Sequence, residues 1–306
     1  MASPFGRLVL IVNPRAGRGE VGREMPELER RIRAGRLDYR IVETEGPGDA
    51  PRLARAALDA GERFLVAVGG DGTIHEVVNG MMVGDGPVAE DAVLGVVSAG
   101  SGSDFVRTFG LPDRVTTAVR HLLTERVYPI DVARITYRDG DEDRTRYFAN
   151  IAEVGLGGAV VARAERLPRS LGRGRYFVGF WLSVARYRPT ELRVKVDRRE
   201  FEGRANNVTI ANCQFYGGGM RISPRSYPAD GKLDVQISTG PKSQAFTILP
   251  KIYRGEHLPD PHIKEMLGAE ITVESDRPVP VEADGEVLGT TPVRVDVLKE
   301  ALRLKI

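Results

Sequence analysis

The sequence has few of the residues that stabilise secreted, zinc-binding or membrane-spanning proteins. Among its 306 residues there is one cysteine, Cys213, so no disulfide can form within the chain and a reducing compartment is expected. The four histidines are scattered, and none is placed with Cys213 as a zinc site requires. Apolar runs such as 8–12 and 93–97 are far shorter than the roughly 20 residues of a membrane-spanning helix. The first residues do not show the pattern of a signal peptide, so we expect a cytoplasmic protein.

Excess charge of one sign is also lacking. The chain has 44 Lys and Arg against 42 Asp and Glu, a net charge of +2, which gives no indication of nucleic-acid binding. Hydrophobic residues make up 42% and charged residues 28%, a balance that excludes a disordered chain and allows a substantial core. At roughly 150 residues per domain, the length favours two domains.

The order of predicted elements divides the chain near residue 128. Before it, apolar strands at 8–12, 39–42, 64–68 and 93–97 alternate with helices at 20–35, 49–60, 73–82 and 115–123. This alternation predicts an N-terminal α/β domain over 1–128, a doubly wound parallel sheet with helices on both faces. Beyond it strands dominate, at 130–137, 146–154, 191–196, 207–213, 232–238, 270–274 and 279–283, with helices only at 159–187 and 243–254. We expect a mainly β domain over 129–306, an antiparallel β-sandwich, with the last strands, 293–298 and 301–305, assignable to either domain.

A glycine-rich turn follows the third predicted strand. Residues 68–73 read Val-Gly-Gly-Asp-Gly-Thr and lead into a helix, so backbone N–H groups at the helix start could bind phosphate. Asp71 would repel phosphate unless a cation or a transferable proton lay between them, which favours magnesium or proton transfer. The structural alternative is an ordinary strand-to-helix turn with Asp71 or Thr73 as the N-cap.

A second loop of this kind follows the fourth predicted strand. Residues 97–105 contain Ser101, Ser103 and Asp104 among glycines. The carboxyl ends of parallel strands meet at one edge of an open α/β sheet, where ligands bind, so both loops are expected there. Turn chemistry alone is the alternative for the serines.

The first strand ends in a turn that overlaps a dinucleotide-like pattern. Gly17, Gly19 and Gly22 match G-x-G-x-x-G, and Glu43 follows at a suitable distance. Four residues separate the strand from the first glycine, whereas the dinucleotide fingerprint has its glycines at the strand end, so a dehydrogenase is disfavoured. A Walker A motif is absent because the only Gly-Lys pair, at 231–232, is followed by Leu.

The second domain adds carboxylates in Asp-Gly pairs. Asp230 precedes Gly231, and Asp284 precedes Gly285 and Glu286. Because Asp-Gly is a common hairpin turn, a structural role is the alternative for each.

Together these motifs resemble the bacterial diacylglycerol kinase catalytic-domain family of soluble lipid kinases, relatives of sphingosine kinases. The resemblance spans nearly the whole chain, from 13–17 through 69–80 and 100–112 to 224–233 and 284–286. Ser101 and Ser103 depart from it, standing where the family usually has Thr and Asn, and Ser226 stands where Ala is usual.

The resemblance implies an ATP- and magnesium-dependent kinase that phosphorylates a lipid hydroxyl. The implied nucleotide-binding residues are Asn13, Pro14, Arg15, Ala16, Gly17, Thr44, Gly69, Gly70, Asp71, Gly72, Thr73, Glu76 and Ser101. Asp284 and Glu286 would lie near the transferred phosphoryl group, with Glu286 the proton acceptor by position and Asp71 bridging magnesium. A structural magnesium would be bound by the Asp230 side chain and the backbone carbonyls of Tyr227 and Lys232.

A basic segment offers a way to reach a lipid. Residues 163–199 contain eleven basic and three acidic residues, a net charge of +8, with aromatic residues between them. We expect docking to an anionic membrane surface, against the alternative of a core helix with a solvated basic face. No nucleic-acid fold signature accompanies this charge, and a homodimer is left open. The diacylglycerol kinase interpretation has as alternatives a kinase of a sphingoid base or other alcohol, a dehydrogenase and a catalytically silent nucleotide-binding regulator.

Overall fold

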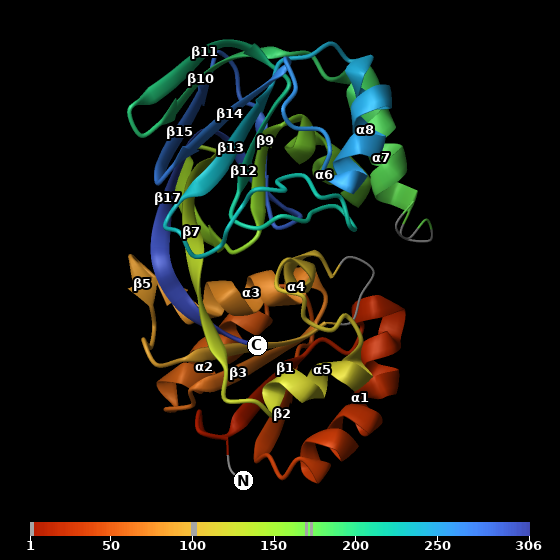
Figure 1. Ribbon diagram of the computed structural model, residues 1–306, viewed down its shortest axis with the longest axis vertical. Coiled ribbons are helices and arrows are strands. Elements are labelled where there is room, and N and C mark those ends of the chain that lie inside the picture. The colour runs from red at the N-terminus through yellow and green to blue at the C-terminus, as the bar shows by residue number, and fades with distance from the viewer. Residues whose placement is uncertain (1–2, 99–102, 169–170, 172–173) are drawn as a thin grey trace. The chain divides into compact units, whose positions relative to one another are not determined.

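The computed structural model describes residues 3–98, 103–168, 171 and 174–306 (Figure 1). The chain divides into two compact units, unit 1 with residues 1–132 and 298–306, and unit 2 with residues 133–297. Both divisions fall inside long strands, β7 (Val127–Asp139) and β17 (Glu286–Lys305). The sequence pattern predicts the change near residue 128 and does not assign the last strands to one domain. The structure assigns the end of β17 to unit 1.

Unit 1 is built on a parallel sheet. Its strands are β1 (Leu8–Val12), β2 (Tyr39–Glu43), β3 (Phe64–Gly69), β6 (Val93–Ser98) and the end of β17, in the order β17-β6-β3-β1-β2. Each strand pairs with its neighbours in parallel, and β1, β3 and β6 are buried along their whole length, as predicted from their apolar runs.

Helices cover both faces of this sheet. The helices are α1 (Ala16–Ala34), α2 (Ala50–Asp59), α3 (Asp71–Met81), α4 (Asp104–Thr108) and α5 (Val115–Leu122). Leu8, Leu10 and Val12 belong to a core with residues of α1 and α5. Val9 and Ile11 alternate with them and are equally buried, on the face that α2 contacts. A two-stranded hairpin, β4 (Met82–Val83) with β5 (Gly86–Pro87), follows α3.

Unit 2 is an antiparallel sandwich. Besides parts of β7 and β17 it contains β8 (Glu142–Phe148), β9 (Ile151–Gly155), β10 (Thr190–Val196), β11 (Arg199–Ala205), β12 (Asn207–Ala211), β13 (Leu233–Ser238), β14 (Ile263–Gly268), β15 (Glu270–Ser275) and β16 (Pro280–Ala283). One path of paired strands runs β14-β13-β12-β9-β16-β17, and another runs β11-β10-β15-β17-β7-β8. Since β17 pairs with both β15 and β16, it belongs to both layers.

The core between the two layers is aliphatic. It includes Val154 and Val208 from one layer and Val194 and Val273 from the other, all fully buried. Three helices lie outside the strands, α6 (Leu156–Glu165), α7 (Gly174–Arg186) and α8 (Gln244–Arg254) (Figure 1). Among the described residues, no helix is both long and apolar enough to cross a membrane.

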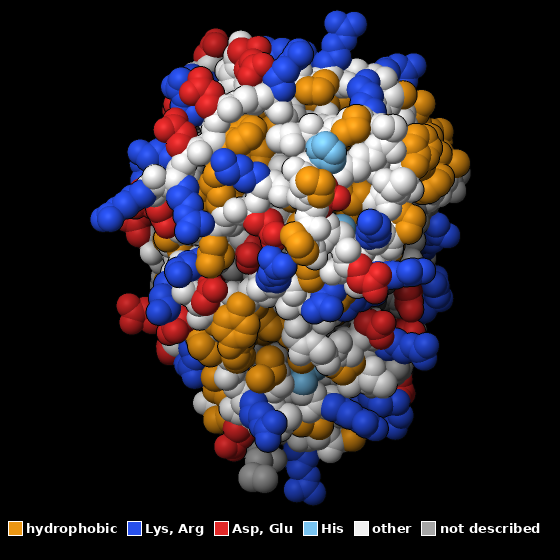
Figure 2. All heavy atoms as spheres, turned by 45° about the horizontal axis from the view of Figure 1, so that its top comes forward, with side chains coloured by type: hydrophobic (Ala, Val, Ile, Leu, Met, Phe, Trp, Pro, Cys, Tyr) orange, Lys and Arg blue, Asp and Glu red, His pale blue; other side chains and the backbone are white. Residues whose placement is uncertain are grey.

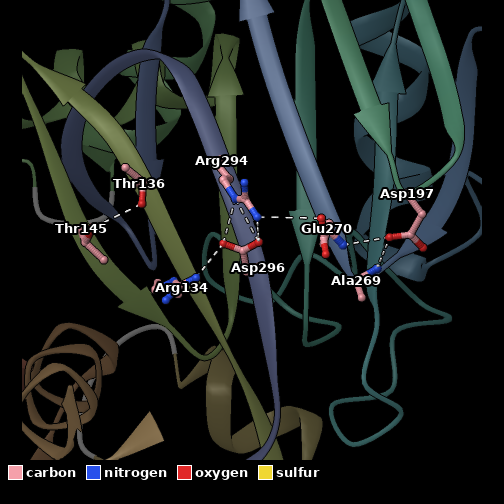
Figure 3. Close-up of polar contacts among 8 residues, drawn as sticks. All are labelled: Arg134, Thr136, Thr145, Asp197, Ala269, Glu270, Arg294 and Asp296. Atoms are coloured by element: carbon pink, nitrogen blue, oxygen red, sulfur yellow. Dashed lines mark hydrogen bonds and ion pairs between the residues drawn. The ribbon is translucent and has the colours of Figure 1, made fainter. Parts of the chain in front are cut away.

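Polar contacts fasten the layer that contains β7, β15 and β17 (Figure 3). Arg134 on β7 and Arg294 on β17 each bond the Asp296 carboxylate at 3.0 Å, and Arg294 also lies 3.8 Å from Glu270 on β15. Burial alone would raise the pKa of Asp296, but hydrogen bonds from the two guanidinium groups outweigh it and lower that pKa. Asp197, at the turn after β10, accepts the N–H groups of Ala269 and Glu270.

The structure corrects three sequence predictions in unit 2. The strand predicted over 146–154 is interrupted after Phe148, because the next backbone N–H groups bond a side chain from another segment. Strands β11 and β14 were missed because charged residues occupy most of the outward positions of β11 and neither strand has a continuous apolar run. The segments predicted at 293–298 and 301–305 are one strand, β17.

Candidate functional site

The loop after β1 is joined to the start of α3. Asn13 donates from Nδ2 to Thr73 Oγ1 at 3.3 Å and accepts the Arg15 N–H at 3.1 Å. Thr44 comes directly after β2, and its N–H bonds the Val12 carbonyl at 2.9 Å. The carboxyl ends of β1, β2 and β3 therefore bring these predicted residues to one edge of the unit 1 sheet.

The turn after β3 needs glycine for steric reasons. A Cβ at Gly69 would lie 2.4 Å from Thr73 Oγ1, closer than any real contact. Gly70 is extended and α3 begins at Asp71, so the start of this helix lies at the same edge of the sheet. Such a helix start stabilises phosphate oxygens through N–H donors and the helix dipole.

Asp71 connects this turn to the loop after β6. Its carboxylate accepts the N–H groups of Asp104 at 3.3 Å and Phe105 at 3.2 Å, at the start of α4. Asp71 therefore caps α4, whereas the structural alternative drawn from the sequence made it the cap of its own helix. Ser103 has a φ of 51° and its hydroxyl contacts Ser98 Oγ at 2.9 Å. Ser101 lies outside the described residues.

Glu76 joins α3 to α2. Its carboxylate accepts the N–H groups of Gly48 at 2.8 Å and Ala50 at 3.2 Å, where α2 begins. This bonding is a structural role that the sequence did not suggest, and the nucleotide-binding role of Glu76 stays a prediction.

Three consecutive left-handed residues interrupt the predicted nucleotide loop. Gly17, Arg18 and Gly19 have φ angles of 60°, 59° and 80°, so the regular part of α1 begins only after them. Pro14, Arg15 and Ala16 form the preceding turn, in which the Ala16 N–H bonds the Asn13 carbonyl at 3.1 Å. Gly17 and Gly19 of the dinucleotide-like pattern thus shape a turn at the start of α1, unlike the strand-end glycines of a dehydrogenase.

In unit 2, Asp284 and Gly285 form the two-residue turn between β16 and β17. Their φ angles are 50° and 87°, and Ala283 pairs with Glu286 across the turn, as expected for an Asp-Gly hairpin. The Asp284 carboxylate accepts three N–H groups, those of Ala149 at 3.2 Å, Asn150 at 3.1 Å and Ile151 at 3.0 Å. Asp284 therefore holds the β8–β9 connection against the hairpin that carries Glu286.

Beneath this hairpin lies a pair of buried glutamates that the sequence analysis missed. Glu153 on β9 and Glu282 on β16 are directly opposite each other, 4% and 0% exposed. Burial raises the pKa of Glu153 to about 7, although hydrogen bonds from Thr209 and Asn207 act to lower it. Burial and the charge of Glu153 raise the pKa of Glu282 well above its usual range. Glu282 also accepts the Gly285 N–H at 2.8 Å, so the pair supports the turn. The sequence signal that could have revealed this pair is a single glutamate inside each of two otherwise apolar strands, β9 and β16.

The predicted metal residues lie in the turn before β13. Asp230 accepts the Lys232 N–H through Oδ1 at 2.9 Å, and the Tyr227 carbonyl accepts the Ala229 N–H at 2.8 Å. No group of three or more His, Cys, Asp or Glu that could hold a metal occurs among the described residues. One carboxylate and two backbone carbonyls are nevertheless all oxygen donors, the class that Mg²⁺ prefers, so this turn fits a magnesium ion.

Two family descriptions match the chain. "Diacylglycerol kinase catalytic domain" matches residues 7–135, and "YegS C-terminal NAD kinase beta sandwich-like domain" matches residues 150–306. The first range contains the loops after β1, β3 and β6, and the second contains the turns at Asp230 and Asp284.

Whole-length relatives carry kinase names. The chain is 27% identical over 305 residues to "Diacylglycerol kinase" of Mycobacterium tuberculosis, covering 98% of this chain and 95% of that protein. It is 26% identical to "Probable lipid kinase YegS-like" of Klebsiella pneumoniae, covering 99% and 97%.

Solved structures agree in fold. A "putative diacylglycerol kinase from Bacillus anthracis" superposes with a TM-score of 0.78 at 24% identity, over 99% of this chain and 98% of that chain. Yeast NADH kinase superposes with a TM-score of 0.53 at 13% identity, over 99% and 83%. The sandwich description alone covers more than half of the chain and the catalytic-domain description covers most of the rest. The chain therefore belongs to the diacylglycerol kinase catalytic-domain family of lipid kinases.

Proposed function

We propose that this lipid kinase transfers the γ-phosphate of ATP to the free hydroxyl of diacylglycerol and forms phosphatidic acid. The observation that carries the proposal is the catalytic-domain match over 7–135, which includes the three loops that Asn13 and Asp71 bond together. The name "Diacylglycerol kinase" of relatives aligned over nearly the whole chain supports the choice of acceptor. The kinase family disfavours the dehydrogenase alternative.

In the proposed reaction, one group of residues positions ATP and another residue accepts the proton of the lipid hydroxyl. The start of α3 and the loops at Asn13–Gly17, Thr44 and Gly69–Thr73 hold the ATP phosphates through backbone N–H groups. The lipid hydroxyl oxygen forms a bond to the γ-phosphorus while the bond to the bridging oxygen of ADP breaks. Glu286 accepts the hydroxyl proton. We favour Glu286 over Asp284 because the oxygens of Asp284 already accept three backbone N–H groups.

We further propose that Asp230, Tyr227 and Lys232 hold a magnesium ion that stabilises the turn before β13. Magnesium bound with ATP would neutralise the negative charge that develops on the γ-phosphate. Asp71, which caps α4, is the residue of unit 1 to which we assign contact with that magnesium ion.

The acceptor lipid requires contact with a bilayer, and we propose peripheral docking at the cytoplasmic face of an anionic membrane through residues 163–199. Support comes from α7, where Phe177 is 62% exposed, and from α8, where Phe246 is 66% exposed. Trp181 on α7 stacks on Phe246 with ring centres 4.5 Å apart, so the two helices present one aromatic surface. Figure 2 shows hydrophobic side chains gathered at its right-hand edge, on the side of α7 and α8, with Lys and Arg side chains around them.

Transfer of labelled phosphate tests the reaction. Purified protein is incubated with γ-labelled ATP, Mg²⁺ and mixed micelles of diacylglycerol, sphingosine or a monoacyl alcohol, and lipids are separated by thin-layer chromatography. We expect labelled phosphatidic acid as the main product. Label in sphingosine phosphate without phosphatidic acid would overturn the proposed acceptor. Flotation with neutral and anionic liposomes tests membrane docking. Equal binding to both kinds of liposome, unaffected by salt, would contradict the proposed docking to an anionic surface.

A further inference from the structure

A pocket lined by arginines lies in unit 2 where α6, the end of α7 and the segment before β16 come together. Its volume is about 260 Å³. Four of its lining residues are arginines, Arg163, Arg186, Arg188 and Arg277, and no acidic residue is among those that line it in the described part of the chain. None of the family motifs includes these arginines.

Neutral acceptors, rather than carboxylates, hold two of these guanidinium groups. Arg163 donates to Ser183 Oγ at 3.2 Å, and Arg277 donates to Thr190 Oγ1 at 2.7 Å and to the Arg188 carbonyl at 2.8 Å. Among residues with described positions, none of the four arginines takes part in an ion pair. Arg193 and Arg294 of the same unit, by contrast, each contact carboxylates.

Four guanidinium groups around one small cavity repel one another, and an anion with several oxygens would offset that repulsion. A phosphate is the matching group, because guanidinium N–H donors bind its oxygens in pairs. The pocket therefore has the positive charge and the N–H donors of a phosphate site, and no carboxylate lines it in the described part of the chain.

A second cavity of about 440 Å³ adjoins the first, since Ala159, Arg163 and Pro280 line both. Its other lining residues are Arg166 and three apolar ones, Ala162, Leu167 and Leu182. The combined shape is an arginine-lined end beside an apolar end, which suits a molecule with a phosphate attached to a hydrocarbon chain.

Close backbone packing holds together the elements that line the two cavities. A Cβ at Gly158 would lie 2.7 Å from the Pro280 carbonyl oxygen, and one at Gly179 would lie 3.2 Å from the Val160 carbonyl oxygen. These two glycines let α6 approach both the start of β16 and α7. Arg163 is thereby held on a helix, and Arg277 lies in the short connection that leads directly into β16.

The pocket is separate from the Asp284 turn. Pro280 begins β16 and Asp284 follows its end, so at about 3.3 Å per residue the two lie about 13 Å apart along the strand. A phosphate in the arginine pocket is therefore not the phosphoryl group that Glu286 would assist.

We propose that the two cavities bind a phosphate-bearing lipid of the membrane, with its phosphate among the four arginines and its acyl chain against Ala162, Leu167 and Leu182. This inference rests on the proposed function only in assuming that the enzyme works at a bilayer. The bound lipid is a second lipid, distinct from the acceptor, and it would hold unit 2 at an anionic surface.

Calorimetric titration without ATP tests the site directly. The ligands are dihexanoyl phosphatidate below its micellar concentration, dihexanoyl phosphatidylcholine, glycerol 3-phosphate and inorganic phosphate. We expect phosphatidate to bind more tightly than each of the other three. If inorganic phosphate bound as tightly as phosphatidate, the site would be one for free phosphate. If phosphatidylcholine bound as tightly as phosphatidate, the arginines would not determine which lipid binds. Either result overturns the proposal, as does the absence of binding.

Four variants locate the binding. Arg163→Gln and Arg277→Gln should each weaken phosphatidate binding about tenfold, the usual effect of losing a charge-assisted hydrogen bond. Arg186→Gln should also weaken phosphatidate binding. Because the Arg186 side chain is exposed, this variant should fold normally, and it tests the site even if Arg163→Gln and Arg277→Gln fold poorly. Ala162→Phe should weaken phosphatidate binding but leave glycerol 3-phosphate binding unchanged.

Arg120→Gln is the matched control, because it removes the same charge from an exposed position on α5, outside residues 163–199. An equal loss of binding in this control would attribute the effect to overall charge and refute the site. Failure of this inference is distinguishable from failure of the proposed function. A protein that phosphorylates diacylglycerol but does not bind dihexanoyl phosphatidate refutes only the site, whereas binding without phosphoryl transfer refutes only the function.

Discussion

The buried pair of Glu153 and Glu282 should make the stability of unit 2 fall as pH rises. In the unfolded chain a glutamate ionises near its ordinary pKa of 4.5, whereas folded Glu153 keeps its proton up to a pKa of about 7. Between these values the folded state binds more protons than the unfolded state, so the free energy of unfolding decreases with pH. The contribution is fully present below pH 4.5 and is lost as pH rises through 7.

The magnitude follows from the linkage between protons and folding. Each bound proton changes the free energy of unfolding by about 1.4 kcal/mol per pH unit, so Glu153 contributes about 3 kcal/mol across the window. The variant Glu153→Gln removes the titrating group but keeps an oxygen that can accept from Thr209 and Asn207. Its slope between pH 5 and pH 6.5 should be shallower by about 1.4 kcal/mol per pH unit, and above pH 7 it should be more stable than the parent protein.

Urea unfolding followed by tryptophan fluorescence measures this effect. Trp181 on α7 is the only tryptophan of the chain, so the signal reports unit 2. The control is Glu274→Gln, which removes a carboxylate that is 62% exposed on β15 and should leave the slope unchanged. If Glu153→Gln and the parent protein show the same slope between pH 5 and pH 6.5, the buried pair is ionised throughout and the reasoning is refuted.

Four further outcomes are expected. Glu286→Gln should reduce turnover at least ~100-fold with an unchanged melting curve; retained turnover in the phosphate-transfer assay would exclude Glu286 as the base. Asp71→Asn should show a similar loss and also cost about 1 kcal/mol in urea unfolding, because one N–H at the start of α4 loses its acceptor. Gly69→Ala should destabilise the chain by about 1–3 kcal/mol and weaken ATP binding, since its Cβ would overlap Thr73; an unaffected Kd would argue against ATP at this turn. Removing divalent cations with EDTA should abolish turnover and excess Mg²⁺ should restore it; activity in EDTA would contradict the magnesium assignment.

The parallel half of the fold could be predicted because its signal is local. Continuous apolar strands such as β1 and β3 are buried on both faces, and Gly69 at the end of β3 is required because a Cβ there would overlap Thr73. The order of strands then brings the loops together at one edge without further information.

The roles of several carboxylates could not be predicted because their partners are distant in sequence. Asp284 bonds N–H groups of residues 149–151, and Glu153 meets Glu282 only through the register of β9 and β16. Asp71 and Glu76 likewise cap helices other than their own. An Asp or Glu in a motif shows that a carboxylate is needed, but only the tertiary structure shows which N–H groups it bonds.

The return of β17 to unit 1 has a consequence for how the protein is made. Residues 303 and 304 pair with Val93 and Leu94 of β6, so the parallel sheet acquires this edge strand only after the whole of unit 2 has left the ribosome. Until then β6 presents unpaired N–H and C=O groups that another chain could bind. A nascent or truncated chain that stops before residue 298 should therefore need chaperone protection, and residues 1–132 expressed alone should aggregate rather than serve as an isolated nucleotide-binding module.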